Sequence, residues 1–133
     1  MGLEERIQEE MYVDAESLLE DEFDRAKSLF DIYDDNTVVI ADEFADADAK
    51  TEILVRLTAQ QYVAEANEDV DPAMGYDSFY DRFEKDESTI RSYFRDLVDD
   101  GLVEKAEEQG HHQLVVERLP DVLDRVESTT DDE

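Results

Sequence analysis

The chain has 133 residues, which suits one domain with an added element, and its 41% hydrophobic content allows a small core. Forty Asp and Glu against twelve Lys and Arg give a formal net charge of −28. The lack of cysteine excludes disulfides and thiolate metal sites, and no apolar run approaches the roughly 18 residues that a membrane span needs. No signal peptide is recognised before the first helix. We therefore expect a soluble cytoplasmic protein with no membrane partner.

The acidic residues are spread along the whole chain, and only four of the twelve basic residues are lysine. This acid-rich, lysine-poor composition resembles that of cytoplasmic proteins from salt-accumulating halophilic archaea. In molar salt the Debye length falls to about 3 Å, so that repulsion between carboxylates is largely screened. A disordered acidic protein is the alternative, but the regular apolar periodicities favour a folded one. On this interpretation the acidity is an adaptation to the solvent and says little about the partner.

Residues 1–44 are predicted to form a helical N-terminal extension that ends in a short strand. Apolar spacing predicts helix over residues 3–33 in two pieces, and Asp14 is placed to cap the second piece. The apolar stripe of the first piece is formed by Leu3, Ile7 and Met11. The wider stripe of the second piece is formed by Leu18, Leu19, Phe23, Ala26, Leu29, Phe30 and Tyr33. Two uses remain open for the wider stripe: packing on the following domain, or pairing with its copy in a homodimer.

A short strand closes the extension, and a long helix follows it. The β-branched run at residues 37–41 predicts the strand, which would either add to a later sheet or form part of a dimer interface. Residues 48–67 predict the strongest helix of the chain, with one buried face. That face is formed by Ile53, Leu54, Leu57, Tyr62, Val63 and Ala66. Pro72 and Gly75 mark residues 67–75 as a loop.

The most regular pattern of the chain comes next. It predicts a short helix over residues 77–83 and a longer one over residues 87–100, with Asp86 placed to cap the longer helix and Gly101 placed to end it. The buried stripe of the two helices is formed by Phe79, Phe83, Ile90, Phe94 and Leu97. The outward positions from residue 88 to residue 95 carry small polar side chains and arginines, but no acid.

After Gly101 the apolar residues alternate with a period of two, which predicts two strands over residues 102–106 and 112–117. Residues 107–111 form the loop between these strands. Gly110 is suited to a positive φ angle in that loop, so the two strands are expected to form a hairpin.

The last apolar pattern predicts a final helix. Pro120 starts this helix, and residues 121–127 place three apolar side chains inward. These side chains belong to Val122, Leu123 and Val126. The polar and acidic residues 128–133 are expected to form a disordered tail.

The two helices, the glycine and the strand pair together resemble the winged helix-turn-helix of DNA-binding domains. The resemblance is carried by Phe79, Phe83, Ile90, Phe94 and Leu97, followed by Gly101, Leu102 and Val103. It implies that residues 45–127 form a mainly α fold with a small β-sheet. In that fold residues 87–100 are the recognition helix, and the hairpin at Gly110 is the wing. The sequence departs from the family pattern at Tyr80 and at Glu84-Lys85, so the turn is expected to be looser.

The resemblance implies DNA contacts from the turn, the outer face of the recognition helix and the wing. Arg91 and Arg95 lie one helical turn apart on that face, where an arginine can reach a guanine edge or a phosphate. The residues expected to bind DNA are Arg82, Lys85, Ser88, Thr89, Arg91, Ser92, Arg95, His111 and His112. The alternative for the two arginines is that they form surface ion pairs with neighbouring carboxylates, which contribute little stability.

The sequence predicts neither an enzyme nor a site for a metal or a cofactor. His111 and His112 adjoin each other in the predicted loop, where they would contact phosphate or lie exposed. Neighbouring side chains on a strand point in opposite directions, so the two histidines are not expected to share a metal ion. The chain contains no glycine-rich phosphate loop and no HExxH or GxSxG motif.

Two functions fit this reading. The first is a DNA-binding transcriptional regulator that acts on double-stranded DNA as a homodimer and is adapted to high salt. The second is a winged helix that makes protein–protein contacts in a transcription, replication or partition assembly. The two differ in where positive potential lies, because DNA binding needs the arginine face to be free of ion pairs.

Overall fold

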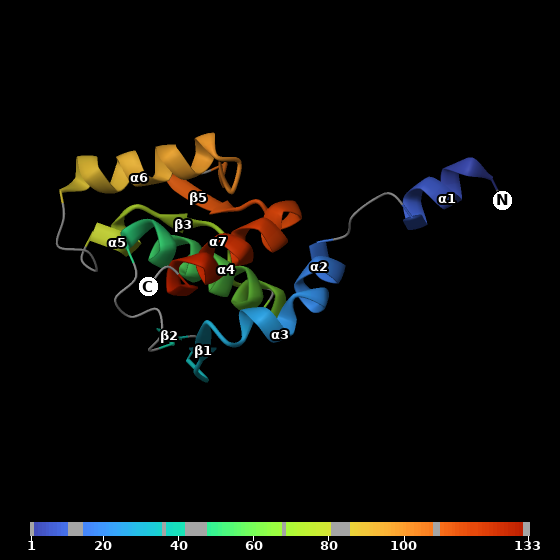
Figure 1. Cartoon of the computed structure of the whole chain (residues 1–133), viewed down its shortest axis with the longest axis horizontal. Helices are drawn as coiled ribbons and strands as arrows, with labels where there is room; N and C mark the ends of the chain where they lie inside the picture. Colours follow the sequence, from blue (N-terminus) through green and yellow to red (C-terminus); the bar gives the residue numbers. More distant parts are fainter. Residues whose placement is uncertain are drawn as a thin grey trace.

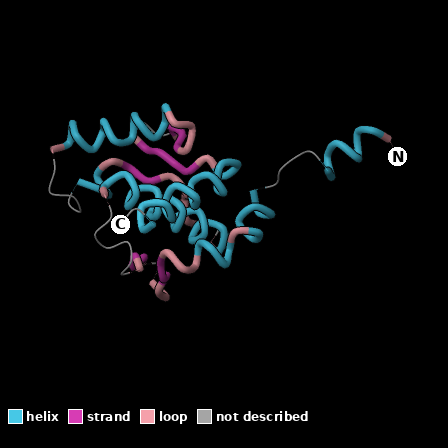
Figure 2. Tube along the Cα trace, viewed as in Figure 1, coloured by secondary structure: helices cyan, strands magenta, loops and turns pink. Residues whose placement is uncertain are grey.

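The structure is a computed structural model that describes residues 2–10, 15–35, 37–41, 48–67, 69–80, 86–107 and 110–131. These residues are mainly helical with two small antiparallel sheets, which confirms the predicted fold class at this level (Figures 1 and 2). The helices are α1 (Leu3–Glu10), α2 (Ala15–Asp21), α3 (Phe23–Ala26), α4 (Ala49–Ala66), α5 (Asp77–Tyr80), α6 (Glu87–Asp99), the 3-10 helix η2 (Val116–Arg118) and α7 (Leu119–Asp131). The strands are β1 (Phe30–Ile32), β2 (Val38–Ile40), β3 (Met74–Gly75), β4 (Val103–Lys105) and β5 (His111–Leu114).

The helix α4 is the element against which most of the others pack. It begins as predicted, because the Asp48 carboxylate accepts a hydrogen bond from the Thr51 backbone N–H at 2.8 Å. The prediction of a single buried face was wrong, since Val55, Thr58 and Ala59 are fully buried as well. The physical reason is tertiary: α4 contacts α6, α7, β5 and the β1–β2 pair, so little of its circumference meets solvent.

The extension differs most from its prediction. Helix ends at Ala26, whereas the apolar spacing predicted helix as far as Tyr33. The strand β1 takes the place of that predicted helix and pairs antiparallel with β2, with Phe30 opposite Ile40. The predicted strand at residues 37–41 is therefore confirmed, but it forms its own hairpin and does not add to the later sheet. The predicted stripe and cap residues Met11 and Asp14 lie outside the described residues.

Hydrogen bonds from Tyr62 and Arg25 help to hold the extension on the rest of the chain. The Tyr62 hydroxyl of α4 donates to the Leu19 carbonyl of α2 at 2.6 Å. Arg25 of α3 donates to Asp124 at 2.7 Å and to Glu127 at 3.0 and 3.1 Å, both on α7. These carboxylates hold the pKa of Arg25 above its ordinary value. Packing on the following domain, one of the two uses left open by the sequence, is thus realised by α2 and α3.

The helix α6 begins at the predicted residue and ends at Asp99, one residue before the predicted end. Ile90, Phe94 and Leu97 are fully buried, and the Asp86 carbonyl accepts the first helical N–H bonds, although its side chain makes no capping bond. Gly101 has a φ of +80°. Its N–H donates to the Val98 carbonyl at 3.0 Å, while the next N–H donates to the Leu97 carbonyl at 3.1 Å. This pair of bonds is the Schellman arrangement, which requires the left-handed conformation that glycine adopts without strain.

The predicted hairpin is confirmed as β4 and β5, but its bounds differ. The strand β5 begins at His111, inside the predicted loop, and the predicted strand residues 116–117 belong to η2. A third strand, β3, pairs with β5 and gives the order β3-β5-β4. Sequence reasoning placed β3 in a loop, because two residues are too few to show an alternating pattern.

The final helix α7 buries Val122, Leu123 and Val126 as predicted. It extends to Asp131, four residues beyond the predicted end at residue 127, so most of the predicted tail is helical. Contacts between α7 and α4 place this helix against the centre of the fold.

Candidate functional site

The outer face of α6 presents the polar side chains that the sequence singled out. Ser88, Arg91, Ser92 and Arg95 are exposed, and Thr89 is partly buried. Figure 1 shows α6 along one edge of the body. The opposite face is held in the core by Phe94, whose ring lies 5.1 Å from that of Phe79 and 4.9 Å from that of His112. Rotation of α6 about its axis would expose Phe94, so the core sets the direction of the outer face.

Arg91 makes two weak contacts on this surface. Its Nη2 atom lies 3.7 Å from Glu87 Oε2, and both side chains are more than half exposed. Its guanidinium lies 5.8 Å from the centre of the Tyr76 ring. An exposed ion pair contributes only about 0–1 kcal/mol, so the pairing with Glu87 leaves Arg91 able to bind another anion.

Two carboxylates in and after the second half of α6 pair with bases of other helices. Asp96 lies 2.8 Å from Lys50 of α4, and Asp100 after the helix lies 2.8 Å from Arg125 of α7. Among the described residues Arg95 forms no ion pair. The sequence left open that both arginines form surface ion pairs. Within the described residues Arg91 forms only a weak one and Arg95 forms none.

A surface pocket of about 550 Å³ lies between α6 and the β4–β5 hairpin. Its lining residues are Tyr76, Arg91, Lys105, Ala106, Gly110, His111 and His112. It brings a cation from α6, a cation from β4 and an imidazole from β5 to one opening. The Tyr76 N–H donates to the Gly110 carbonyl at 3.2 Å and holds the hairpin tip beside the pocket. Lys105 was not among the residues that the sequence predicted to bind DNA. Its position next to the predicted hairpin loop could have indicated it.

His112 corrects the sequence prediction. It is 3% exposed and packs between the rings of Tyr76, at 5.1 Å, and Phe94, at 4.9 Å. Burial lowers its pKa, with Lys105 and His111 adding to the effect. Its Nδ1 atom has no hydrogen-bond partner among the residues that the structure describes. The expectation that His112 would lie exposed was wrong, because alternation along β5 turns it toward the core while His111 borders the pocket.

Arg82 and Lys85, also expected to bind DNA, lie outside the described residues, as does the predicted core residue Phe83. The described members of the expected site fall into two groups. Ser88, Thr89, Arg91, Ser92 and Arg95 share α6, and His111 joins Arg91 at the pocket.

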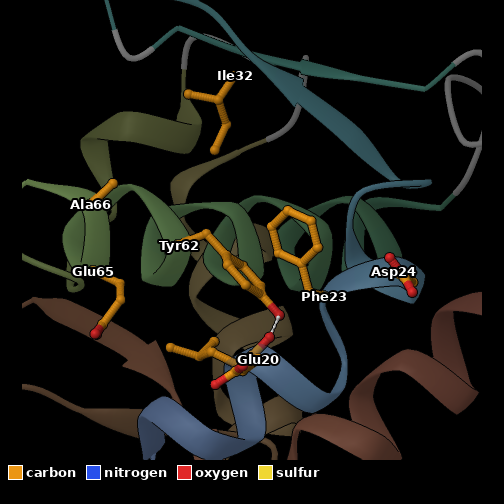
Figure 3. A pocket seen from close by; sticks show the side chains of 8 residues that line it. Glu20, Phe23, Asp24, Ile32, Tyr62, Glu65 and Ala66 are labelled. Atoms are coloured by element: carbon orange, nitrogen blue, oxygen red, sulfur yellow. Dashed lines mark hydrogen bonds between the residues drawn. The ribbon is translucent and has the colours of Figure 1, made fainter.

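A second opening, of about 570 Å³, lies on the other side of the chain's core, and the sequence did not indicate it. It is an apolar groove between the extension and α4 (Figure 3). Its lining residues are Leu19, Glu20, Phe23, Asp24, Ile32, Tyr62, Glu65 and Ala66. We refer to these eight residues as the extension groove. It is visible only in the folded chain, because it combines residues of α2, α3, β1 and α4.

No protein-family model, curated protein or solved structure matches this chain. Within the ranges that the structure describes, none of the helices combines the length and the apolar character needed to cross a membrane. The same ranges contain no group of three or more His, Asp or Glu side chains arranged to hold a metal ion.

Proposed function

We propose that the chain is a winged helix-turn-helix transcriptional regulator that binds double-stranded DNA. In this proposal α6 is the recognition helix and the β4–β5 hairpin is the wing. The observation that carries it is the outer face of α6, where Arg91 and Arg95 stand among small polar side chains with no acid between residues 88 and 95. A recognition helix of this kind enters the major groove with such side chains toward the base edges.

Each part of the surface has a distinct task in this proposal. Arg91 and Arg95 can each donate two hydrogen bonds to the O6 and N7 atoms of a guanine, which is the most common specific contact to a base. Ser88 and Ser92 are short enough to let the helix approach the groove. Lys105 and His111, at the far side of the pocket, are placed to meet a phosphate, since phosphate contacts set the position of the protein on the duplex.

The net charge of −28 bears directly on this proposal. In dilute buffer the carboxylates would repel DNA. In the molar potassium salt of a halophilic cytoplasm the Debye length falls to about 3 Å, so only groups near contact distance interact. High salt also weakens phosphate contacts, because the release of counterions into concentrated salt gains less entropy. We therefore expect base contacts by the arginines to supply more of the affinity than they do in proteins that work at low salt.

The second candidate is a protein–protein interaction module in a transcription, replication or partition assembly. It is favoured by the extension groove, an open apolar surface with acidic residues at its rim. On this alternative the arginine face of α6 would never meet a phosphate.

The experiment that tests the first proposal is a selection from genomic DNA fragments in molar KCl, followed by binding measurements on the selected fragments. The variant is Arg91→Ala combined with Arg95→Ala, and the control is Arg118→Ala. Arg118 is also an exposed arginine in a surface ion pair, but it lies in η2. We expect the double variant to lose specific binding and the control to retain it. Unchanged binding by a folded double variant would leave the interaction module as the better proposal.

A further inference from the structure

Exposed apolar surface is confined to one part of the described chain. The large hydrophobic side chains that are exposed are Leu3, Phe23, Ile32, Tyr33 and Val39. All five belong to the extension, and none belongs to the described part of residues 48–131. Gathered apolar surface on a folded protein marks a binding site more often than scattered single residues do. The extension therefore has a surface that the single chain leaves uncovered.

The extension groove is the concave part of this surface. Figure 3 shows Phe23, Ile32 and Tyr62 around one opening, contributed by α3, β1 and α4. The Tyr62 ring is fixed by its hydrogen bond to the Leu19 carbonyl and by edge-on contact with Phe23, at 6.1 Å between ring centres. Burial raises the pKa of Tyr62 to about 12, with Glu22 adding to the effect, so the hydroxyl remains a donor. A smaller pocket of about 280 Å³ is also lined by Phe23, Ile32 and Tyr62, and it extends the extension groove.

The helix α1 is the matching convex part. Leu3 and Ile7 are one helical turn apart and lie on one face, and Leu3 is 71% exposed. Figure 1 shows α1 standing away from the body of the chain, so its own groove does not receive it. A helix of eight residues is shorter than the ~12–15 residues at which isolated helices become even marginally stable in water. The apolar face of α1 therefore requires a surface to pack on.

We propose that α1 of a second copy of this chain occupies the extension groove, and that two copies exchange these helices reciprocally. The exchange makes two equivalent contacts related by a two-fold axis. Together they cover the α1 face and the groove of each chain, and they close the assembly at a dimer. Docking places Leu3 and Ile7 against Phe23, Ile32 and Tyr62. The exchange requires no DNA, so it is independent of the proposed function.

The charges around the groove make this contact dependent on salt. Its rim carries Glu20, Asp24 and Glu65, all exposed, and α1 brings Glu4 and Glu5 alongside the single base Arg6. These carboxylates repel one another across a Debye length of about 10 Å at 0.1 M salt, and of only about 3 Å at 1 M. Apolar contact between α1 and the groove is weakened far less by salt. The dimer should thus form more tightly as the KCl concentration rises.

The absence of native cysteine allows a direct test by disulfide cross-linking. Two single-cysteine proteins are prepared, Ile7→Cys on α1 and Ala66→Cys at the groove, and are mixed under mild oxidation in molar KCl. A disulfide requires Cα atoms within about 7 Å, so a covalent dimer of the two different chains reports α1 in the partner's groove. Ser92→Cys on the outer face of α6 is the control partner, and we expect no comparable product from it. Absence of the Ile7–Ala66 cross-link in a folded mixture overturns the proposal.

Sedimentation of variants without cysteine provides the second measurement. Ile7→Ser should weaken dimerisation at least about tenfold, the effect of losing one aliphatic group from an apolar site. Glu5→Asp keeps the charge on the opposite face of α1 and should leave the dimer intact. A dimer that is insensitive to Ile7→Ser would place the contact elsewhere. A monomer at every salt concentration would show that no exchange occurs.

Discussion

The outer face of α6 and the extension groove are both open surfaces, but they are built from opposite chemistry. The α6 face carries Arg91 and Arg95 and stands on a completely buried stripe. The groove is lined by Phe23, Ile32 and Tyr62, with carboxylates at its rim. Salt should act on them in opposite directions, because it screens the attraction of arginine for phosphate but strengthens apolar contact between acidic chains. The proposed DNA contact and the proposed association contact thus lie on separate surfaces, and they should respond differently to salt.

The largest expected effect concerns salt and acts on both surfaces at once. With a net charge of −28 over 133 residues, we expect the chain to be loosened in dilute buffer and to gain structure as KCl rises to molar concentration. Thermal unfolding followed by circular dichroism from about 0.1 to 3 M KCl, where the Debye length falls from about 10 Å to below 3 Å, checks this. A midpoint that stays constant over that range would contradict it.

The next prediction compares the contributions of two side chains to stability: Leu97 beneath the α6 face and Phe23 in the extension groove. Leu97→Ala empties a fully buried site beneath α6 and should lower the free energy of unfolding by about 2–5 kcal/mol. Phe23→Ala removes a ring that is 51% exposed in the single chain, so it should cost only about 1 kcal/mol at concentrations where the chain is monomeric. Denaturant unfolding in molar KCl measures both values, with Ser92→Ala as the neutral control. Equal losses from the two variants would mean that the groove is as well packed as the core.

The third prediction tests the α6 face alone. Arg91→Ala should weaken specific DNA binding by about 1–3 kcal/mol if it contacts a base, and Arg91→Glu should abolish it. Folding should be unchanged in both variants, since the side chain is exposed and its ion pair with Glu87 is weak. Fluorescence anisotropy at fixed molar KCl gives the affinity. The same variants should leave the oligomeric state unchanged, because α6 is remote from the extension groove in the fold.

The smallest effect comes from His112, which supports the pocket from below. Burial lowers the pKa of His112, so the unfolded chain takes up a proton near pH 6.5 while the folded chain does not. The stability from this group is therefore complete above about pH 6.5 and is lost as the pH falls below that value, by at most about 1.4 kcal/mol per pH unit. Unfolding measured from pH 5.5 to 7.5 should show this loss in the wild type and not in His112→Phe. His111→Gln is the control, and a variant curve parallel to the wild type would exclude the effect.

Periodicity in the sequence was enough to place α4, α6, the Gly101 ending and the β4–β5 hairpin. Each of these elements depends on spacing within one segment: Ile90, Phe94 and Leu97 recur at helical intervals, and a glycine stands where a positive φ angle is needed. The same spacing identified the exposed side chains of α6, because the residues of a helix that do not belong to its buried stripe lie on its outer face. The DNA-binding role of those side chains stays a prediction.

Only the tertiary structure decided which strands pair, which histidine is buried and where the apolar surface of the extension lies. Phe30 fits a helical stripe as well as a strand, and the hydrogen bonds to Val38–Ile40 settle the choice. His112 shares a face of β5 with Leu114, and its burial depends on the packing of that face against Tyr76 and Phe94. The groove combines four elements separated along the chain. These features depend on contacts between distant segments, whose free energy no local window of sequence contains.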